Sequence, residues 1–168
     1  MTHSSIAQAI ERRLQGLPQG LREHIYRVRE LAADLARHHA IDAEKAWLGA
    51  SGHDIMRAVP VQELLERARA LGLPVTDVDQ YFPVLLHGPV AAETLRREDG
   101  LADPEVYEAI YWHSTARRDL GPVGKVVFLA DKLDPHKSDR YSYGKELASL
   151  ARRDLDSALR MFLDWELK

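Results

Sequence analysis

The sequence predicts an all-α fold, because apolar residues recur at helical spacing, alternating strand patterns are hard to find, and glycines and prolines separate short segments. The 168 residues, of which 45% are hydrophobic and 29% charged, suffice for one domain with a continuous core. No internal repeat, low-complexity tract or linker divides the chain. We therefore expect a single helical bundle domain over residues 1–168.

The first part of the chain divides into three expected helices. A short leading helix at about residues 6–14, within the leading segment 1–19, ends at the break GLPQG. In the next helix, apolar residues follow His24 at steps of four, three and four, which places His24 on the inner face. Asp42 is expected to cap a third helix, whose inner face includes His53.

The middle of the chain is expected to hold shorter helices. A polar amphipathic helix is predicted at about residues 61–71, and the break LGLP separates it from a short helical piece near residues 77–86. His87 then opens a helix with the sequence HGPVAAETLRRE.

The last part of the chain carries clear helix-start signals. Asp103 is the expected N-cap of a helix with Pro104 at its first position, and His113 lies on the apolar face of that helix. Another helix, with Asp131 on its inner face, ends at the dipeptide DP. Residues 144–168 are expected to form one or two helices packed on the surface through a leucine-rich face.

Composition excludes several classes of function. A formal net charge of −3 gives no broad basic surface, so we expect no nucleic-acid partner. The chain has no cysteine, which excludes disulfides, thiolate metal sites and a cysteine nucleophile. No signal-peptide pattern and no apolar run near the roughly 20 residues of a membrane span are present, so we expect no membrane association and a cytoplasmic location.

Polar residues on the apolar helix faces are the unusual feature of the sequence. Six of them combine imidazole and carboxylate groups: His24, His53, Asp54, His87, His113 and Asp131. Burying unpaired polar groups is costly, so these side chains must satisfy one another, reach water or share a cation. The joint metal site is the favoured interpretation, because six such positions are harder to explain by coincidence than one.

Each of these residues also has an ordinary structural interpretation. A single core histidine most often donates a hydrogen bond to a backbone carbonyl group. Asp131 would pair with Lys132 or Lys125, and Asp54 with Arg57.

The chemistry of the six residues favours a pair of metal ions. Imidazole and carboxylate ligands suit iron, manganese, cobalt, nickel or zinc, and six ligands exceed the needs of one tetrahedral ion. His53 and Asp54 are adjacent in a helical segment, so their side chains diverge by roughly 100 degrees and can serve different ions. Two ions about 4 Å apart activate water for phosphoryl hydrolysis.

Longer strings around the six residues resemble a known family. HGPVAAETLRREDGLADPEVYEAIYWHSTAR, followed by GKVVFLADKLDP, is similar to HD-domain metallophosphohydrolases, and within them to the bacterial hydrolases that split diadenosine tetraphosphate (Ap4A) symmetrically into two ADP. The resemblance covers about residues 20–160. It implies an all-helical HD domain with a di-metal centre, usually of iron, and a nucleotide substrate.

The resemblance also implies roles for individual residues. The ligands of one ion would be His24, His53, Asp54 and Asp131, and Asp54 would bridge to a second ion held by His87 and His113. Activated water would then attack phosphorus in line. The resemblance gives catalytic roles to Asp54, Arg57 and Arg117, and phosphate-binding roles to Arg57, Arg117, Lys132 and Arg140. The alternative interpretation of Arg57, Arg117 and Arg140 is that each is a solvated surface charge with no such role.

The sequence departs from the family at a few positions near the expected nucleotide site. Ser51 and Gly52 replace an apolar pair, and His136 and Lys137 replace an Asn-Arg dipeptide, with Arg140 displaced by a short insertion. Gly49 and Gly52 are expected to let a neighbouring helix approach closely, whereas the Ser-Gly pair itself has no firm account.

Several alternatives therefore stay open. One alternative is an HD domain that hydrolyses other nucleotides, and another is a domain that binds nucleotides without catalysis. Trp165 and Tyr143 are expected at the surface, where they would serve either a homodimer contact or ordinary packing.

Overall fold

The computed structural model describes residues 3–138 and 141–167, and this part of the chain contains helices and no strand, which confirms the all-α prediction. In chain order, the elements are α1 (His3–Leu14), α2 (Gln19–His38), α3 (Ala43–Gly52), α4 (Val61–Ala70), α5 (Asp77–Tyr81), the 3-10 helix η1 (Pro83–Leu86), α6 (His87–Glu98), α7 (Pro104–Trp112), α8 (Pro122–Lys132), α9 (Pro135–Ser138), α10 (Gly144–Arg153) and α11 (Leu155–Glu166). None of these helices is long and apolar enough to cross a membrane.

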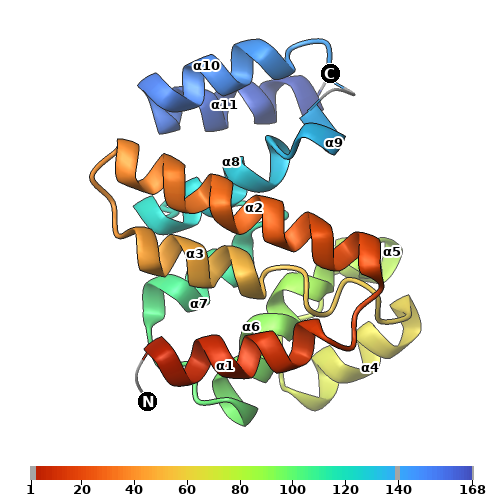
Figure 1. The fold of residues 1–168 in the computed structure, drawn as a ribbon. Coiled ribbons are helices and arrows are strands. Elements are labelled where there is room, and N and C mark those ends of the chain that lie inside the picture. The colour runs from red at the N-terminus through yellow and green to blue at the C-terminus, as the bar shows by residue number, and fades with distance from the viewer. Residues whose placement is uncertain (1–2, 139–140, 168) are drawn as a thin grey trace.

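Helices α2, α3, α7 and α8 form the centre of the bundle. Helix α3 packs against α2, α7 and α8, while α10 and α11 form a hairpin at one end and α1 and α4 lie at the other (Figure 1). The core has two hydrophobic clusters, one around Phe128, Leu129 and Leu147 and the other around Ile10, Leu64 and Leu95. Helices α2, α3 and α7 contribute residues to both clusters, so they tie the two ends of the domain together.

The helix-start signals in the sequence are confirmed. The Asp42 carboxylate accepts hydrogen bonds from the backbone N–H groups of Glu44 and Lys45 at the start of α3. Asp103 caps α7 in the same way, and Pro104 occupies the first turn, where its missing N–H costs nothing. These caps fix where the helices that carry His53 and His113 begin.

One expected segment is divided in the structure, and the tail has two helices, within the one or two expected. The piece near residues 77–86 becomes α5 and η1, because Phe82 precedes Pro83 and adopts φ −127° and ψ 66°, outside the helical range. The tail forms two helices, since Asp154 is extended at φ −156° and its carboxylate caps α11 by accepting from the Ser157 N–H.

Two glycines of α3 bring that helix close to its neighbours, as expected from the sequence. A Cβ atom on Gly49 would lie 3.1 Å from the Ala109 Cβ, and one on Gly52 would lie 2.7 Å from the Ile110 Cδ1. Both contacts are with α7, so the glycines allow α3 and α7 to pack tightly just before His53.

The expectation that Tyr143 is a surface residue is wrong. Its side chain is buried, because its ring stacks on Trp165 with centroids 4.8 Å apart and also packs on Phe162. Trp165 remains partly exposed at 43%.

Candidate metal centre

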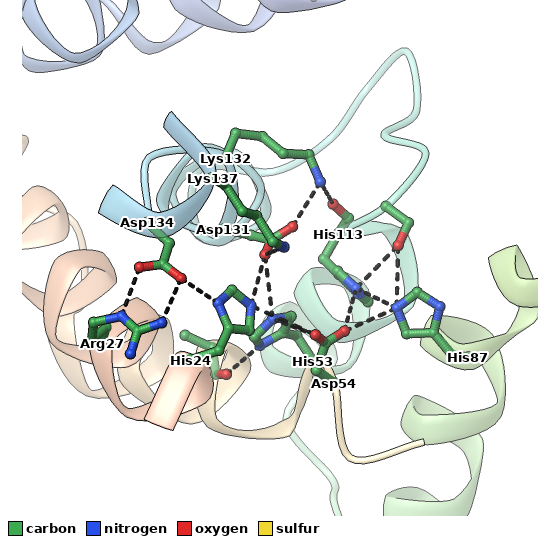
Figure 2. Close-up of polar contacts among 12 residues, drawn as sticks. His24, Arg27, His53, Asp54, His87, His113, Asp131, Lys132, Asp134 and Lys137 are labelled. Carbon is green, nitrogen blue, oxygen red and sulfur yellow. Dashed lines mark hydrogen bonds and ion pairs between the residues drawn. The ribbon is translucent and has the colours of Figure 1, made fainter. Parts of the chain in front are cut away.

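The six predicted donor residues meet at the centre of the bundle, and all of them are buried. They come from several elements: His24 from the second turn of α2, His53 and Asp54 from the residues directly after α3, His87 from the start of α6, His113 from the residue directly after α7, and Asp131 from the last turn of α8. In Figure 2 their side chains point toward one another. The fold therefore joins residues that lie far apart in the sequence.

Helix ends fix the orientation of three of the four imidazole rings. The Nδ1 atom of His53 lies 2.6 Å from the Ala50 carbonyl oxygen, and His87 Nδ1 has the same contact with Val84. His113 Nδ1 lies 2.8 Å from the carbonyl oxygen of Ile110, again three residues earlier. Because a carbonyl oxygen accepts hydrogen bonds only, each Nδ1 carries a proton, and in the neutral ring Nε2 presents a lone pair to the centre.

The two carboxylate oxygens of Asp54 face different pairs of histidines. Oδ1 lies 3.0 Å from His87 Nε2 and 3.4 Å from His113 Nε2. Oδ2 lies 3.5 Å from His53 Nε2 and 3.6 Å from His24 Nε2. Asp54 therefore lies between two sets of imidazole nitrogens (Figure 2).

Asp131 completes the set on the side of His24. Its Oδ1 lies 3.1 Å from His24 Nε2 and 3.6 Å from His53 Nε2. Donor atoms of His24, His53 and Asp131 all lie within 4.8 Å of one another, and the same holds for His53, Asp54 and His113. Two three-residue groups of suitable spacing thus share His53.

The donor atoms have the pattern that a bound cation requires. The Nε2 atoms of His24 and His53 are buried and make no hydrogen bond with any residue that the structure describes. The Nε2 atoms of His87 and His113 face each other at 2.9 Å, although both Nδ1 atoms already donate to carbonyl groups. Lone pairs that face one another repel unless a proton or a metal ion lies between them, so the residues fit a divalent metal.

Charge balance in the cluster favours ionised carboxylates. Burial acts to raise the pKa of Asp54, but the interactions with His53, His113 and His87 outweigh it and hold this pKa well below its ordinary value. Burial lowers the pKa of His113 to about 4, so this ring is neutral near pH 7. Carboxylates and neutral imidazoles are the protonation states in which these side chains bind metals.

The pKa of Asp131 is likewise held well below its ordinary value. Burial opposes this shift, whereas Lys132, His24 and His53 lower the pKa together and outweigh it.

Comparison with known proteins agrees with this geometry. The family model described as HD domain matches residues 21–136. The chain belongs to the HD domain family. It is 33% identical over 150 residues to the symmetrical bis(5'-nucleosyl)-tetraphosphatase of Halalkalibacterium halodurans, which covers 87% of this chain and 79% of that relative. The enzyme of the same name from Bacillus subtilis is 31% identical over 153 residues, with 89% and 81% covered.

A solved structure shares the fold of this HD domain over almost its whole length. It is a predicted HD superfamily hydrolase from Clostridium acetobutylicum described as involved in NAD metabolism. Its TM-score is 0.88 at 26% sequence identity, and the match covers 99% of this chain and 86% of that one.

Basic side chains surround the carboxylate of Asp131 in this HD domain. Lys132 Nζ lies 2.7 Å from Asp131 Oδ2, and Lys137 Nζ contacts Oδ1. Of the two pairings considered from the sequence, the one with Lys132 is present, whereas Lys125 Nζ lies 2.6 Å from Asp156.

The residues predicted to bind phosphate lie in different surroundings. Lys132 reaches the metal-binding cluster, by which we mean the six donor residues, through its contact with Asp131. Arg57 is exposed in the turn after Asp54. The side chain of Arg117 is 46% exposed, and its Nη1 lies 3.7 Å from Glu108 Oε1. Arg140 lies outside the described residues.

Sequence reasoning missed the residues that orient His24. The Nδ1 atom of His24 lies 2.6 Å from Oδ2 of Asp134, which is buried at 1% exposure. Arg27 holds Asp134 in turn, with its Nε 2.8 Å from Oδ1 and its Nη2 3.0 Å from Oδ2. The spacing of Asp134, three residues after Asp131, was the available signal, but only the fold brings it to His24.

Ser114 is a second residue that sequence reasoning missed. Its Oγ lies 3.0 Å from His113 Nε2 and 3.4 Å from His87 Nε2. This hydroxyl group therefore borders the metal-binding cluster.

Proposed function

We propose that the protein is a metal-dependent hydrolase that splits Ap4A and related dinucleoside polyphosphates symmetrically, with two ADP molecules as the products from Ap4A. The observation that carries this proposal is the position of Asp54, whose two oxygens face separate pairs of imidazole nitrogens. A carboxylate so placed suits a bridge between two metal ions. The names of the relatives from Halalkalibacterium halodurans and Bacillus subtilis support the substrate and the symmetrical cleavage.

The six donor residues divide between two ions in this proposal. His24, His53, Asp54 and Asp131 would hold one ion. His87 and His113 would hold the other, together with Asp54. When bound, such ions polarise phosphoryl oxygens and lower the pKa of water.

The chain's own residues supply orientation and charge. The carbonyl groups of Ala50, Val84 and Ile110 keep the Nδ1 atoms protonated, so the Nε2 lone pairs stay directed inward. Lys132 and Lys137 place two ammonium groups next to Asp131, where they offset the negative charge of an incoming polyphosphate. Arg57, Arg117 and Arg140 are the further proposed phosphate contacts.

The reaction balances as a single hydrolysis. The oxygen of one water molecule forms a bond to one of the two central phosphorus atoms, and the bond from that phosphorus to the oxygen that joins the two central phosphorus atoms breaks. The proton that the water loses goes to the solvent or to the departing oxygen. One ADP keeps the water oxygen, and the other leaves with the bridging oxygen.

The product profile tests this proposal. Metal-loaded protein incubated with Ap4A is expected to release ADP alone, measured by anion-exchange chromatography. Equal amounts of AMP and ATP would contradict symmetrical cleavage. If the protein does not hydrolyse Ap4A but hydrolyses another nucleotide in a panel, the assigned substrate is wrong and the assignment as a hydrolase stands.

The setting of the enzyme forms part of the same proposal. Iron is the proposed native metal, with manganese, cobalt and nickel as substitutes that the same ligands accept. A cytoplasmic location agrees with the absence of cysteine from the chain. A homodimer through Trp165 is the proposed assembly; metal analysis tests the metal, and light scattering tests the dimer.

A further inference from the structure

A cavity of about 430 Å³ lies next to the metal-binding cluster. It lies between α8, α9 and α11, with Tyr141 ahead of α10 and Ser114 after α7 at its edge, and its lining includes Lys132, Lys137 and Glu166. In Figure 1 these elements meet at the end of the bundle formed by the α10 and α11 hairpin. Its volume is within the usual range of small-ligand pockets.

One end of the cavity is lined by residues that contact the proposed metal ligands. Ser114 Oγ lies 3.0 Å from His113 Nε2, and Lys132 Nζ lies 2.7 Å from Asp131 Oδ2. Lys137 also contacts Asp131 and lines the same cavity (Figure 2). A phosphate group held at the metal ligands would therefore lie beside two ammonium groups and within reach of the cavity.

The wall of the cavity is aromatic. Phe128, Tyr141 and Phe162 line it. The rings of Tyr141 and Phe162 are edge-on with centroids 5.9 Å apart, and those of Phe128 and Phe162 are 5.5 Å apart in the same arrangement. Phe128 and Phe162 are buried, whereas Tyr141 is partly exposed and stacks on Tyr143 with centroids 5.3 Å apart, so at most the other face of its ring is left for a flat ligand. Aromatic side chains of this kind stack on nucleobases.

Two other surfaces fit a nucleotide less well. A larger cavity of about 640 Å³ carries Arg117, Arg118 and Arg160, but its described lining includes no aromatic ring and neither of the two lysines that contact Asp131. Tyr81, the last residue of α5, and Phe82, which follows it, are exposed at 82% and 62%. They lie on the surface, whereas the cavity next to the cluster is lined by the two lysines that contact Asp131.

We infer that the cavity next to the cluster binds the nucleoside of one half of the dinucleotide, with its base against Tyr141 and its phosphates near Lys132 and Lys137. The inference rests on the proposed function, because it takes a nucleoside diphosphate as half of the substrate. Its chemistry applies equally to ADP, which contains the same base, ribose and two phosphates.

Binding of ADP to metal-loaded protein tests the pocket by isothermal titration calorimetry. Tyr141→Ala is expected to weaken ADP binding about tenfold, since loss of a base-stacking ring costs roughly five- to 150-fold. Tyr141→Phe keeps the ring and is expected to bind within twofold of the wild type. Tyr81→Ala, which removes an exposed aromatic ring outside the pocket, is the matched control and is expected to leave the affinity unchanged.

Pyrophosphate serves as the probe that has no base. Its affinity is expected to stay within twofold in Tyr141→Ala, because the phosphates contact the lysines and the metal ligands. Equal losses for ADP and pyrophosphate would mean that the substitution damages the metal site, and unchanged ADP binding would remove Tyr141 from the pocket. Either result overturns the inference, as does a loss confined to Tyr81→Ala.

The failure of this inference is distinguishable from failure of the proposed function. If wild-type protein does not split Ap4A but Tyr141→Ala still loses ADP affinity, the pocket stands and the reaction is reassigned. If Ap4A is split to ADP and both the KM and the ADP affinity of Tyr141→Ala equal those of the wild type, the reaction stands and the pocket is wrong.

Discussion

Two buried carboxylates in this protein have opposite surroundings. Glu93 in α6 is 3% exposed, and its oxygens accept hydrogen bonds from Arg96, Arg97 and the Tyr107 hydroxyl group. Asp54 is 5% exposed, and its oxygens face the Nε2 atoms of His53, His87 and His113. In each of these three rings, the Nδ1 atom faces a backbone carbonyl group and already carries the proton.

The difference indicates which buried charge is structural and which belongs to a site. Hydrogen bonds, led by the one from Arg96, lower the pKa of Glu93 to about 2 against the opposing effect of burial. The guanidinium groups of Arg96 and Arg97 thus balance the charge of Glu93 without a metal ion. In the cluster around Asp54, Lys132 and Lys137 pair with Asp131, whereas both oxygens of Asp54 face imidazole nitrogens. Those of His24 and His53 are buried without a hydrogen bond to a described residue, an arrangement that fits a metal ion from outside the chain.

The largest expected effect separates the two carboxylates by activity. Asp54→Asn is expected to lower turnover of Ap4A about a thousandfold, because the proposed bridge between two ions would be lost and metal catalysis supplies several kcal/mol. Glu93→Gln, the matched substitution, is expected to keep turnover within a few-fold when the protein is folded. Steady-state kinetics and circular dichroism check both variants, and unchanged turnover in Asp54→Asn would remove the di-metal mechanism.

Metal addition should stabilise the protein by completing the Asp54 cluster. At about 100 times the dissociation constant, Mn²⁺ is expected to add about 2.7 kcal/mol, which raises the Tm by about 5 to 10 °C. Ca²⁺, which prefers oxygen ligands, is expected to give a smaller shift. Differential scanning calorimetry of metal-free protein measures the shifts, and an equal shift with Ca²⁺ would speak against the histidine ligands.

The orientation of His24 gives an intermediate effect. Asp134→Asn is expected to weaken metal binding about 10- to 100-fold, because it changes the group that accepts the hydrogen bond from His24 Nδ1. Asp42→Ala, which removes the cap of α3, is the control: it should cost about 1 kcal/mol of stability and leave metal affinity unchanged. Competition with a chromophoric chelator measures the affinities, and equal affinity in Asp134→Asn and the wild type would contradict the positioning role.

The smallest effect concerns pH and the closed network of Glu93. Its pKa is about 2 in the folded protein and ordinarily 4.5, so its stabilising contribution is present above pH 4.5 and is lost as pH falls toward 2. The contribution is about 1 to 2 kcal/mol, reduced because Arg96 and Arg97 are half exposed. Urea unfolding at several pH values should show a flatter dependence in Glu93→Gln than in the wild type between pH 4.5 and 2. Parallel curves would mean that Glu93 does not titrate as described.

Local sequence determined much of the fold. The caps at Asp42 and Asp103 and the breaks at prolines and glycines predict where helices begin and end, because each signal acts within a few residues. The apolar periodicity also predicts that His24, His53 and His113 face the core. The division at Phe82 was harder to predict, because it depends on the backbone conformation of a single residue, and the sequence left open whether the tail has one helix or two.

Only the tertiary structure decided how those residues meet. Asp134 contacts His24 across 110 positions of sequence, and Tyr143 is buried because Trp165 and Phe162 cover it. The spacing of apolar residues along one helix predicts which face is buried but not which residues that face contacts, since contacts between helices depend on packing of the whole bundle. The sequence by itself thus determined which residue types point inward, while packing of the bundle decided which atoms of Asp54 and the histidines face each other.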